Sequence, residues 1–345
     1  MASVDVSVRG AGIFGLSVAW ACVKAGARVE LVDPNGLGSG SSGGVVGALA
    51  PHVPENWNPK KQFQLESLLM AEAFWAEVCE ISGQPTGYTC AGRIQPIADA
   101  HALKLATERA TGAARLWQDR AQWSVRRDAQ GWEITSPSGA YVFDTLSAHI
   151  HPRQACVALA VALREKGVPL LSTPSGAADA TVWATGADGL QDVTAEVART
   201  VGQGIKGQAA LMDINCAGLP QLFVDTLHVI PHLDGTVAIG STTEREFDHP
   251  TRTDSQLDDL IARAQRAVPQ LAEAKVIERW AGLRPRARSR APMLGAWPNR
   301  PGHYIANGGF KIGFGMAPKI GEVMAELVLN GHKTIPKGFD VTDSV

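Results

Sequence analysis

Three glycines near the start of the chain have the spacing of a phosphate-binding turn. Gly10, Gly12 and Gly15 form a G-x-G-x-x-G pattern between a valine-rich run and an apolar helical pattern. In such a turn the first glycine permits the tight bend, the second lets a pyrophosphate approach the backbone, and the third lets helix and strand pack closely. The free N–H groups of the helix N-terminus then favour a negatively charged group. The spacing predicts a dinucleotide site, and an ordinary glycine-rich strand-to-helix turn is the alternative.

The sequence around this turn supports the dinucleotide interpretation. Residues 4–8 and 27–33 predict two strands, and the helical pattern between them ends at Gly26. The second strand ends on Asp33, where an acid can accept a hydrogen bond from a ribose hydroxyl. Strand, turn, helix, strand and acid therefore follow one another in the order that a dinucleotide-binding unit requires.

A second loop rich in glycine and serine follows the acid. Residues 34–52 read PNGLGSGSSGGVVGALAPH, where an NAD-binding unit would soon enter its next helix. The backbone N–H groups and hydroxyls of this loop are suited to wrapping a second phosphate face and the edge of a flavin. The loop therefore favours FAD over NAD, with a flexible linker as the alternative. His52, at the end of the loop, is a candidate for the substrate pocket.

Composition limits the class of protein. The chain has 345 residues, a formal net charge of −2 and five scattered cysteines without metal-ligand spacing. These features predict a cytoplasmic globular protein with free thiols and no metal site. Neither the weak acidity nor the length of the apolar runs indicates a nucleic-acid or membrane partner. The sequence leaves the oligomeric state open.

Dinucleotide-type patterns occur at the beginning, in the middle and at the end of the chain, with strand and hairpin patterns between them. We therefore predict a mixed α/β fold in which a Rossmann-like FAD-binding domain is interleaved with a β-sheet substrate domain. The expected limits are residues 1–60, 150–204 and 280–345 for the first domain, and residues 61–149 and 205–279 for the second. Helices are predicted at 61–83, 101–119, 255–269 and 318–330, a helix followed by a strand at 151–171, a short strand in 179–189, a hairpin at 131–143, and further strands at 90–97, 205–214, 221–241, 276–284 and 303–307.

Several segments, in their order along the chain, resemble the D-amino-acid oxidase family of flavoenzymes, particularly its glycine oxidase and sarcosine oxidase branches. They are GAGIFGLSVAWACVKAGARVELVD, GSGSSGGVVGALAP, HPRQACVALAVALREKGV, VWATGADGL, VIPHLDGTVAIGSTTE, WAGLRPRARSRAPMLG and YIANGGFKIGFGMAPKIGEVMAELVLNG. The resemblance implies an enzyme that oxidises the carbon–nitrogen bond of a small amine or amino acid by hydride transfer to FAD. Reoxidation by molecular oxygen would then give hydrogen peroxide. No cysteine stands where a covalent flavin link is expected, so we predict non-covalent binding.

The resemblance also implies roles for individual residues. Arg284 stands at the motif where the family has an arginine that binds the substrate carboxylate, and an arginine at a rigid strand end can form two parallel hydrogen bonds. His228 replaces a tyrosine and Lys311 replaces an arginine that glycine oxidases tend to carry, which argues against glycine itself as substrate. His228 is either a packed histidine or a substrate contact, and Lys311 faces either the flavin edge and substrate or solvent. The other arginines of this motif, Arg286, Arg288 and Arg290, are expected to form a solvated basic loop.

A helix that begins at Pro318 is expected to face the flavin carbonyl, because its N-terminus favours negative charge. A dehydrogenase that uses another electron acceptor and a flavin-binding protein with a degraded active site are the competing functions. The predicted catalytic residues are Arg284, His228, Lys311 and His52. The predicted cofactor contacts are Gly10, Gly12, Ile13, Phe14, Gly15, Asp33, Pro34, Ser41, Ser42, Gly47, Ala48, Thr185, Gly186, Arg284, Gly309, Phe310, Lys311, Ile312 and Gly313.

Overall fold

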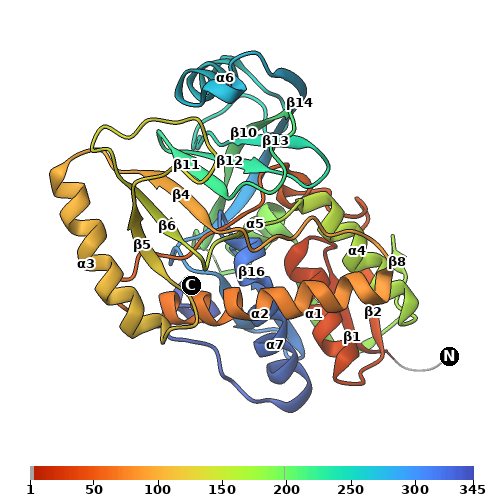
Figure 1. Ribbon diagram of the computed structural model, residues 1–345. Helices are drawn as coiled ribbons and strands as arrows, with labels where there is room; N and C mark the ends of the chain where they lie inside the picture. The colour runs from red at the N-terminus through yellow and green to blue at the C-terminus, as the bar shows by residue number, and fades with distance from the viewer. Residues whose placement is uncertain (1–3, 198) are drawn as a thin grey trace.

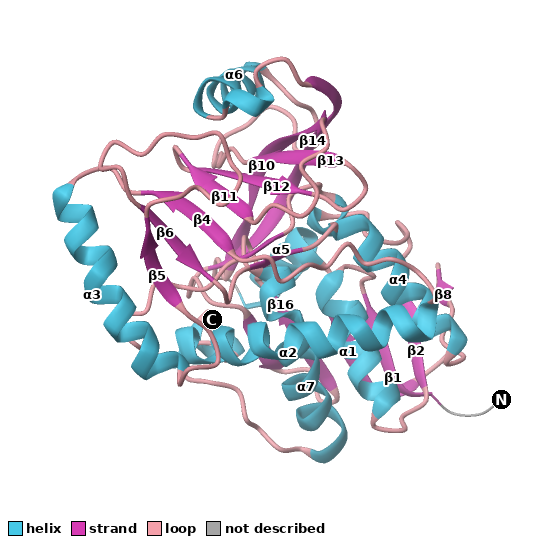
Figure 2. Cartoon of the chain, in the orientation of Figure 1, coloured by secondary structure: helices cyan, strands magenta, loops and turns pink. Residues whose placement is uncertain are grey.

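The computed structural model describes residues 4–197 and 199–345. Two large sheets, one of six and one of eight strands, build most of the molecule, and a small sheet pairs β3 with β7. Figure 2 shows the helices gathered mainly around the six-stranded sheet, with α3 and α6 beside the eight-stranded one. This arrangement confirms the predicted mixed α/β class.

The six-stranded sheet has the order β15-β16-β9-β1-β2-β8, and its strands come from the beginning, middle and end of the chain. Strand β1 lies between β2 and β9 and is parallel to both. Helix α1 (Ile13–Lys24) joins β1 to β2, as the glycine spacing predicts. The strands are β1 (Val4–Arg9), β2 (Val29–Val32), β8 (Leu170–Leu171), β9 (Ala178–Trp183), β15 (Met293–Ala296) and β16 (His303–Asn307).

The eight-stranded sheet has the order β14-β10-β13-β12-β11-β4-β6-β5. Adjacent strands in this sheet are antiparallel, except that β4 and β11 are parallel to each other. The domain limits that the sequence predicts stay a prediction. The strands are β4 (Arg93–Pro96), β5 (Trp123–Arg126), β6 (Tyr141–Asp144), β10 (Gly202–Asp213), β11 (Gln221–Val224), β12 (Leu227–Pro231), β13 (Thr236–Gly240) and β14 (Lys275–Ala287).

The largest hydrophobic core lies where α1, α2, α4 and α7 pack together, and it includes the buried indoles of Trp20 and Trp75. In Figure 1 helix α2 crosses α1 and lies above α7. The remaining elements are α2 (Pro59–Ser82), α3 (Ala100–Trp117), α4 (Pro152–Glu165), α5 (Gly186–Val197), α6 (Ser255–Ala267), α7 (Gly313–Asn330), β3 (Ala48–Leu49) and β7 (Ala148–His149).

Two local predictions are wrong. Helix α7 begins at Gly313, so Pro318 lies inside the helix and not in its first turn. The buried residues Gly315 to Ala317 pack into the core, and this packing extends the helix ahead of the proline. The hairpin predicted at 131–143 does not form, because β6 pairs with β4 and β5. The buried Trp132 instead donates its ring N–H to the Pro220 carbonyl at 2.8 Å.

Candidate active site

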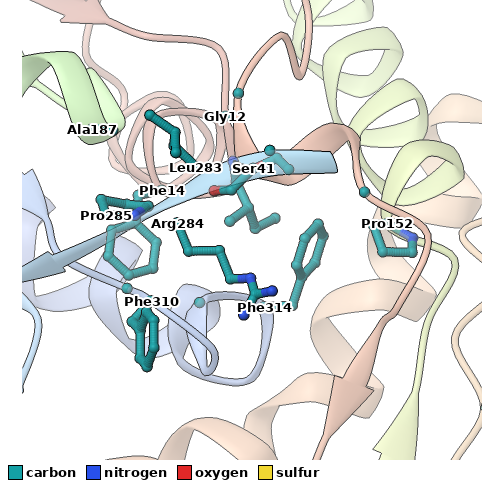
Figure 3. Close-up of a pocket in the computed structure, with 18 of the residues that line it drawn as sticks. Gly12, Phe14, Ser41, Pro152, Ala187, Leu283, Arg284, Pro285, Phe310 and Phe314 are labelled. Atoms are coloured by element: carbon teal, nitrogen blue, oxygen red, sulfur yellow. Dashed lines mark hydrogen bonds between the residues drawn. The ribbon is translucent and has the colours of Figure 1, made fainter. Parts of the chain in front are cut away.

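A cavity of about 980 Å³ lies at the carboxyl ends of β1, β2 and β9 and reaches one face of the eight-stranded sheet. Ligands of open α/β sheets bind at these strand ends. The loop after β2, the start of α5, part of β14 and the segment before α7 complete its wall. Figure 3 shows side chains from these separate segments pointing toward a common space.

The glycine turn after β1 forms one end of the cavity. Gly10 has a φ of +105°, and a Cβ there would lie 2.4 Å from the Ala184 carbonyl oxygen. No side chain caps Gly12 at the N-terminus of α1. The next N–H group, that of Ile13, donates to Ser42 Oγ at 3.0 Å, which ties the turn to the serine-rich loop. A helix N-terminus with little side-chain cover suits a pyrophosphate.

Gly15 is the one predicted cofactor contact that does not line the cavity. A Cβ at this position would lie 1.9 Å from the Gly10 carbonyl oxygen, so Gly15 permits the close contact of helix and turn. Its role is that of the third glycine in the pattern, which is packing. The predicted contacts that do line the cavity are Gly10, Gly12, Ile13, Phe14, Asp33, Pro34, Ser41, Ser42, Gly47, Ala48, Thr185, Gly186, Arg284, Gly309, Phe310, Lys311, Ile312 and Gly313.

The turn fixes the carboxylate of Asp33 at the cavity edge. One oxygen accepts the Ala11 N–H at 2.8 Å, and the other accepts the Asn35 N–H at 2.9 Å. Each oxygen keeps a further lone pair for a ligand hydroxyl. Across the turn, a Cβ on Gly309 would lie 2.7 Å from the Phe14 ring, so the first and last glycine-rich segments meet here.

Arg284 on β14 is a buried cation of the cavity wall, with 7% of its surface exposed. Its Nη2 donates to the Thr242 carbonyl at 3.1 Å, while its Nη1 is buried without a hydrogen-bond partner. Burial lowers the pKa of Arg284 to about 10, so the guanidinium stays charged at neutral pH. In Figure 3 this side chain extends into the space beside Phe314. Gly207 on β10 makes room for it, because a Cβ there would lie 1.2 Å from Nη2.

An ionic cluster around the buried Lys206 of β10 supports the segment that contains Thr242. Lys206 Nζ lies 2.7 Å from Asp254 Oδ2 and 3.2 Å from Glu244 Oε2. Gln208 donates to both carboxylates, and its backbone N–H donates to Thr242 Oγ1 at 2.8 Å. This cluster was not expected from the sequence, although the alternating polar residues Lys206 and Gln208, directly ahead of the apolar run AALM in β10, are a signal that could have indicated it.

His228 and Lys311, the two replacements of family residues, both line the cavity. The Nδ1 of His228 is buried without a hydrogen-bond partner, and its ring lies 4.9 Å from that of Phe223. Burial, together with the positive charges of Arg93 and Lys311, lowers the pKa of His228 to about 3, so the ring is neutral. Lys311 is only partly buried at the cavity wall, and this partial burial together with the positive charges of Arg284 and Arg286 lowers its pKa to about 8.

His52 also lines the cavity and is held by Gln64 of α2. Its backbone N–H donates to Gln64 Oε1 at 2.7 Å, and its ring Nδ1 contacts the same oxygen. Burial lowers the pKa of His52. Several lining residues of the sheet face and α2 were not expected from the sequence, because local patterns do not connect them with the glycine turn. These are Gln64, Arg93, Phe223 and Trp280.

Residues 4–197 and 199–345 contain no group of three histidine, cysteine, aspartate or glutamate side chains that could hold a metal ion. Of the helices described, none combines the length and the apolar character that crossing a membrane needs.

Comparison with known proteins agrees with this geometry. The family model described as DAO, FAD dependent oxidoreductase, matches residues 5–327. Glycine oxidase of Bacillus licheniformis is 24% identical, over 94% of this chain and 93% of that protein. The crystal structure of glycine oxidase from Geobacillus kaustophilus superposes with a TM-score of 0.85 at 22% identity, covering 99% of both chains. That of iminodiacetate oxidase from Chelativorans sp. BNC1 gives a TM-score of 0.83 at 21% identity, covering 97% and 98%.

Proposed function

The chain belongs to the DAO family of FAD-dependent oxidoreductases, and on this basis we propose that it oxidises the carbon–nitrogen bond of a small amino acid or amine. When bound, FAD supplies the ring that takes up the hydride. The glycine turn at the N-terminus of α1, where Gly12 provides no side-chain cap, and the fixed carboxylate of Asp33 are the groups that we propose hold the pyrophosphate and ribose. None of the five cysteines lines the cavity, which supports non-covalent binding.

The observation that carries the proposal is the buried Arg284 guanidinium with an unpartnered Nη1 at the cavity wall. A buried cation with a free donor is stabilised by a carboxylate, which it can bind through two parallel hydrogen bonds. Arg284 would thus fix the substrate carboxylate and, through it, the face of the α carbon that is presented for oxidation.

We propose that His228 contacts the substrate amine. This neutral ring has a buried Nδ1 without a partner, and it lies on the sheet face that lines the cavity. A neutral imidazole can accept a hydrogen bond from an amine without adding a positive charge.

The acidic residues that line the cavity are Asp33, Asp188 and Asp192, all from segments at the carboxyl ends of the six-stranded sheet. We therefore propose orientation, and not proton transfer by a carboxylate, as the main contribution of the protein.

An anaerobic screen of the FAD-loaded enzyme tests this function. Glycine, sarcosine, proline, D-amino acids and larger N-substituted amines would each be mixed with enzyme while the flavin absorbance is followed. We expect bleaching by an amino acid but not by the amine that lacks its carboxylate. Failure of every amine to bleach the flavin would overturn the proposal.

The Arg284→Lys variant tests the bidentate contact, because it keeps the charge and loses the planar fork. It should slow reduction by carboxylated substrates. Arg288→Ala is the matched control, since Arg288 is exposed on the same segment and does not line the cavity.

Admission of oxygen after anaerobic reduction tests which electron acceptor the enzyme uses. Peroxide formed in proportion to substrate supports an oxidase, whereas reduced enzyme that persists in air indicates another acceptor.

A further inference from the structure

Five cations, here called the cationic group, lie at or beside the substrate side of the cavity. Arg284 and Lys311 line the cavity, and Lys60, Arg286 and Arg290 lie beside it. None of them forms an ion pair with a carboxylate of the described part of the chain. Unpaired cations that are close together repel one another, and burial strengthens this repulsion. A ligand that binds among them therefore gains from carrying negative charge.

Contacts place the members of this group together. Arg286 Cζ lies 5.3 Å from the centre of the Phe310 ring, and Lys311 Nζ lies 5.8 Å from the same centre. Lys60 reaches across from α2 and donates to the Arg290 carbonyl. Burial and the charges of Arg284 and Arg286 lower the pKa of Lys311, while burial and the charges of Arg286 and Arg290 lower that of Lys60.

Nearby acids do not neutralise the group. Glu244 lies close enough to Arg284 to oppose the lowering of its pKa, but its carboxylate is 3.2 Å from Lys206 Nζ. Arg93, the other arginine on the substrate side of the cavity, is compensated by the buried Asp144 at 3.1 Å. The cationic group, unlike Arg93, therefore carries positive charge that no nearby carboxylate compensates.

Two members of the group line the cavity itself, at different depths. Arg284 is buried and has one free donor, whereas Lys311 is exposed toward the opening. One substrate carboxylate can accept both hydrogen bonds that the Arg284 guanidinium offers, which leaves the positive charge of Lys311 without a partner.

We propose that the substrate is an amine that carries two carboxylates, one bound by Arg284 and the other by Lys311, with Arg286 and Lys60 adding to the attraction at the opening. This inference rests on the proposed function, because it assigns a substrate class to the same site. It makes the charge of the substrate, and not its size alone, the basis of selection.

Pairs of probes that differ by one carboxylate test the inference on the FAD-loaded enzyme. Iminodiacetate is compared with sarcosine, and D-aspartate with its isostere D-asparagine, by stopped-flow measurement of anaerobic flavin reduction. A charge-assisted hydrogen bond predicts that the better dicarboxylate exceeds its partner by about tenfold or more in the ratio of reduction rate to Kd. The preference should weaken as salt concentration rises.

Variants at position 311 distinguish substrate binding from an effect on the flavin. Lys311→Met should abolish the preference by slowing only the dicarboxylate, and Lys311→Arg should retain it. The exposed Arg288→Ala variant is the control and should keep the preference. Equal reduction by both members of each pair, or an equal loss for both in Lys311→Met, would overturn the inference while leaving amine oxidation intact.

A binding measurement separates this inference from the proposed function. Malonate and acetate carry no amine, so their effect on the flavin spectrum reports binding without turnover. We expect malonate to bind at least tenfold more tightly than acetate, and Lys311→Met to remove the difference. Equal affinities would overturn the inference, even if every amine in the screen failed to reduce the flavin.

Discussion

Replacement of Gly207 by alanine would displace the guanidinium of Arg284 without removing its charge. The new Cβ would lie 1.2 Å from Nη2, 2.1 Å from Cζ and 2.7 Å from Nε of Arg284. Gly207 lies within strand β10, and its φ is outside the left-handed range, so alanine fits the backbone itself. The side chain of Arg284 must therefore move and lose its contact with the Thr242 carbonyl.

The size of the effect follows from the interaction that is lost. A hydrogen-bonded contact between a guanidinium and a carboxylate contributes about 3 kcal/mol when one partner is buried. Since about 1.4 kcal/mol corresponds to a factor of ten, the ratio of reduction rate to Kd should fall about a hundredfold for carboxylated substrates. FAD content should not change, because the proposed pyrophosphate and ribose contacts, the glycine turn and Asp33, are left unaltered.

Anaerobic stopped-flow reduction of Gly207→Ala, alongside its FAD content, measures this loss. Gly176→Ala is the control, since Gly176 is exposed and its Cβ would meet nothing within 4 Å. A fully FAD-loaded Gly207→Ala enzyme that reacts with carboxylated substrates at the wild-type rate would refute the role given to Arg284.

Three further changes test other contacts. Lys206→Met leaves the buried Glu244 without its cation, so the free energy of unfolding should fall by about 3 kcal/mol in urea denaturation; an unchanged midpoint would contradict this. His228, with a pKa of about 3, is neutral from pH 5 to 8, so His228→Asn should preserve the shape of the pH–rate profile, and loss of a limb in this range would show that His228 titrates there. Gly15→Ala brings Cβ within 1.9 Å of the Gly10 carbonyl and should cost about 1–3 kcal/mol, measured as a lower Tm.

The sequence was most informative where one short segment determines the structure. The glycine turn and Asp33 lie within a single strand–helix–strand unit, so their spacing alone predicts their positions. The motif predicts Arg284 at the end of a strand, but β14 continues to Ala287, so Arg284 lies within the strand. The structure places Arg284 at the cavity, as it does His228 and Lys311. The roles of these three residues stay predictions.

The sequence was least informative where contacts join distant segments. Lys206 meets Asp254 through a loop without periodicity, so no local pattern connects them. Arg286 was expected in a solvated loop with Arg290, but it is half-buried beside Phe310. Lys60 of α2 contacts the Arg290 carbonyl, and spacing along the chain does not predict such a contact between distant segments.

The meeting of Phe14 with Gly309 has a consequence for how the protein is made. During translation the glycine turn is synthesised first, whereas the segment that contains Gly309 is synthesised only when most of the chain is already made. Contacts between such distant segments form slowly, because a long loop must close before they can stabilise anything. The wall that Phe14 and Gly309 form together is therefore complete only when nearly the whole polypeptide is available.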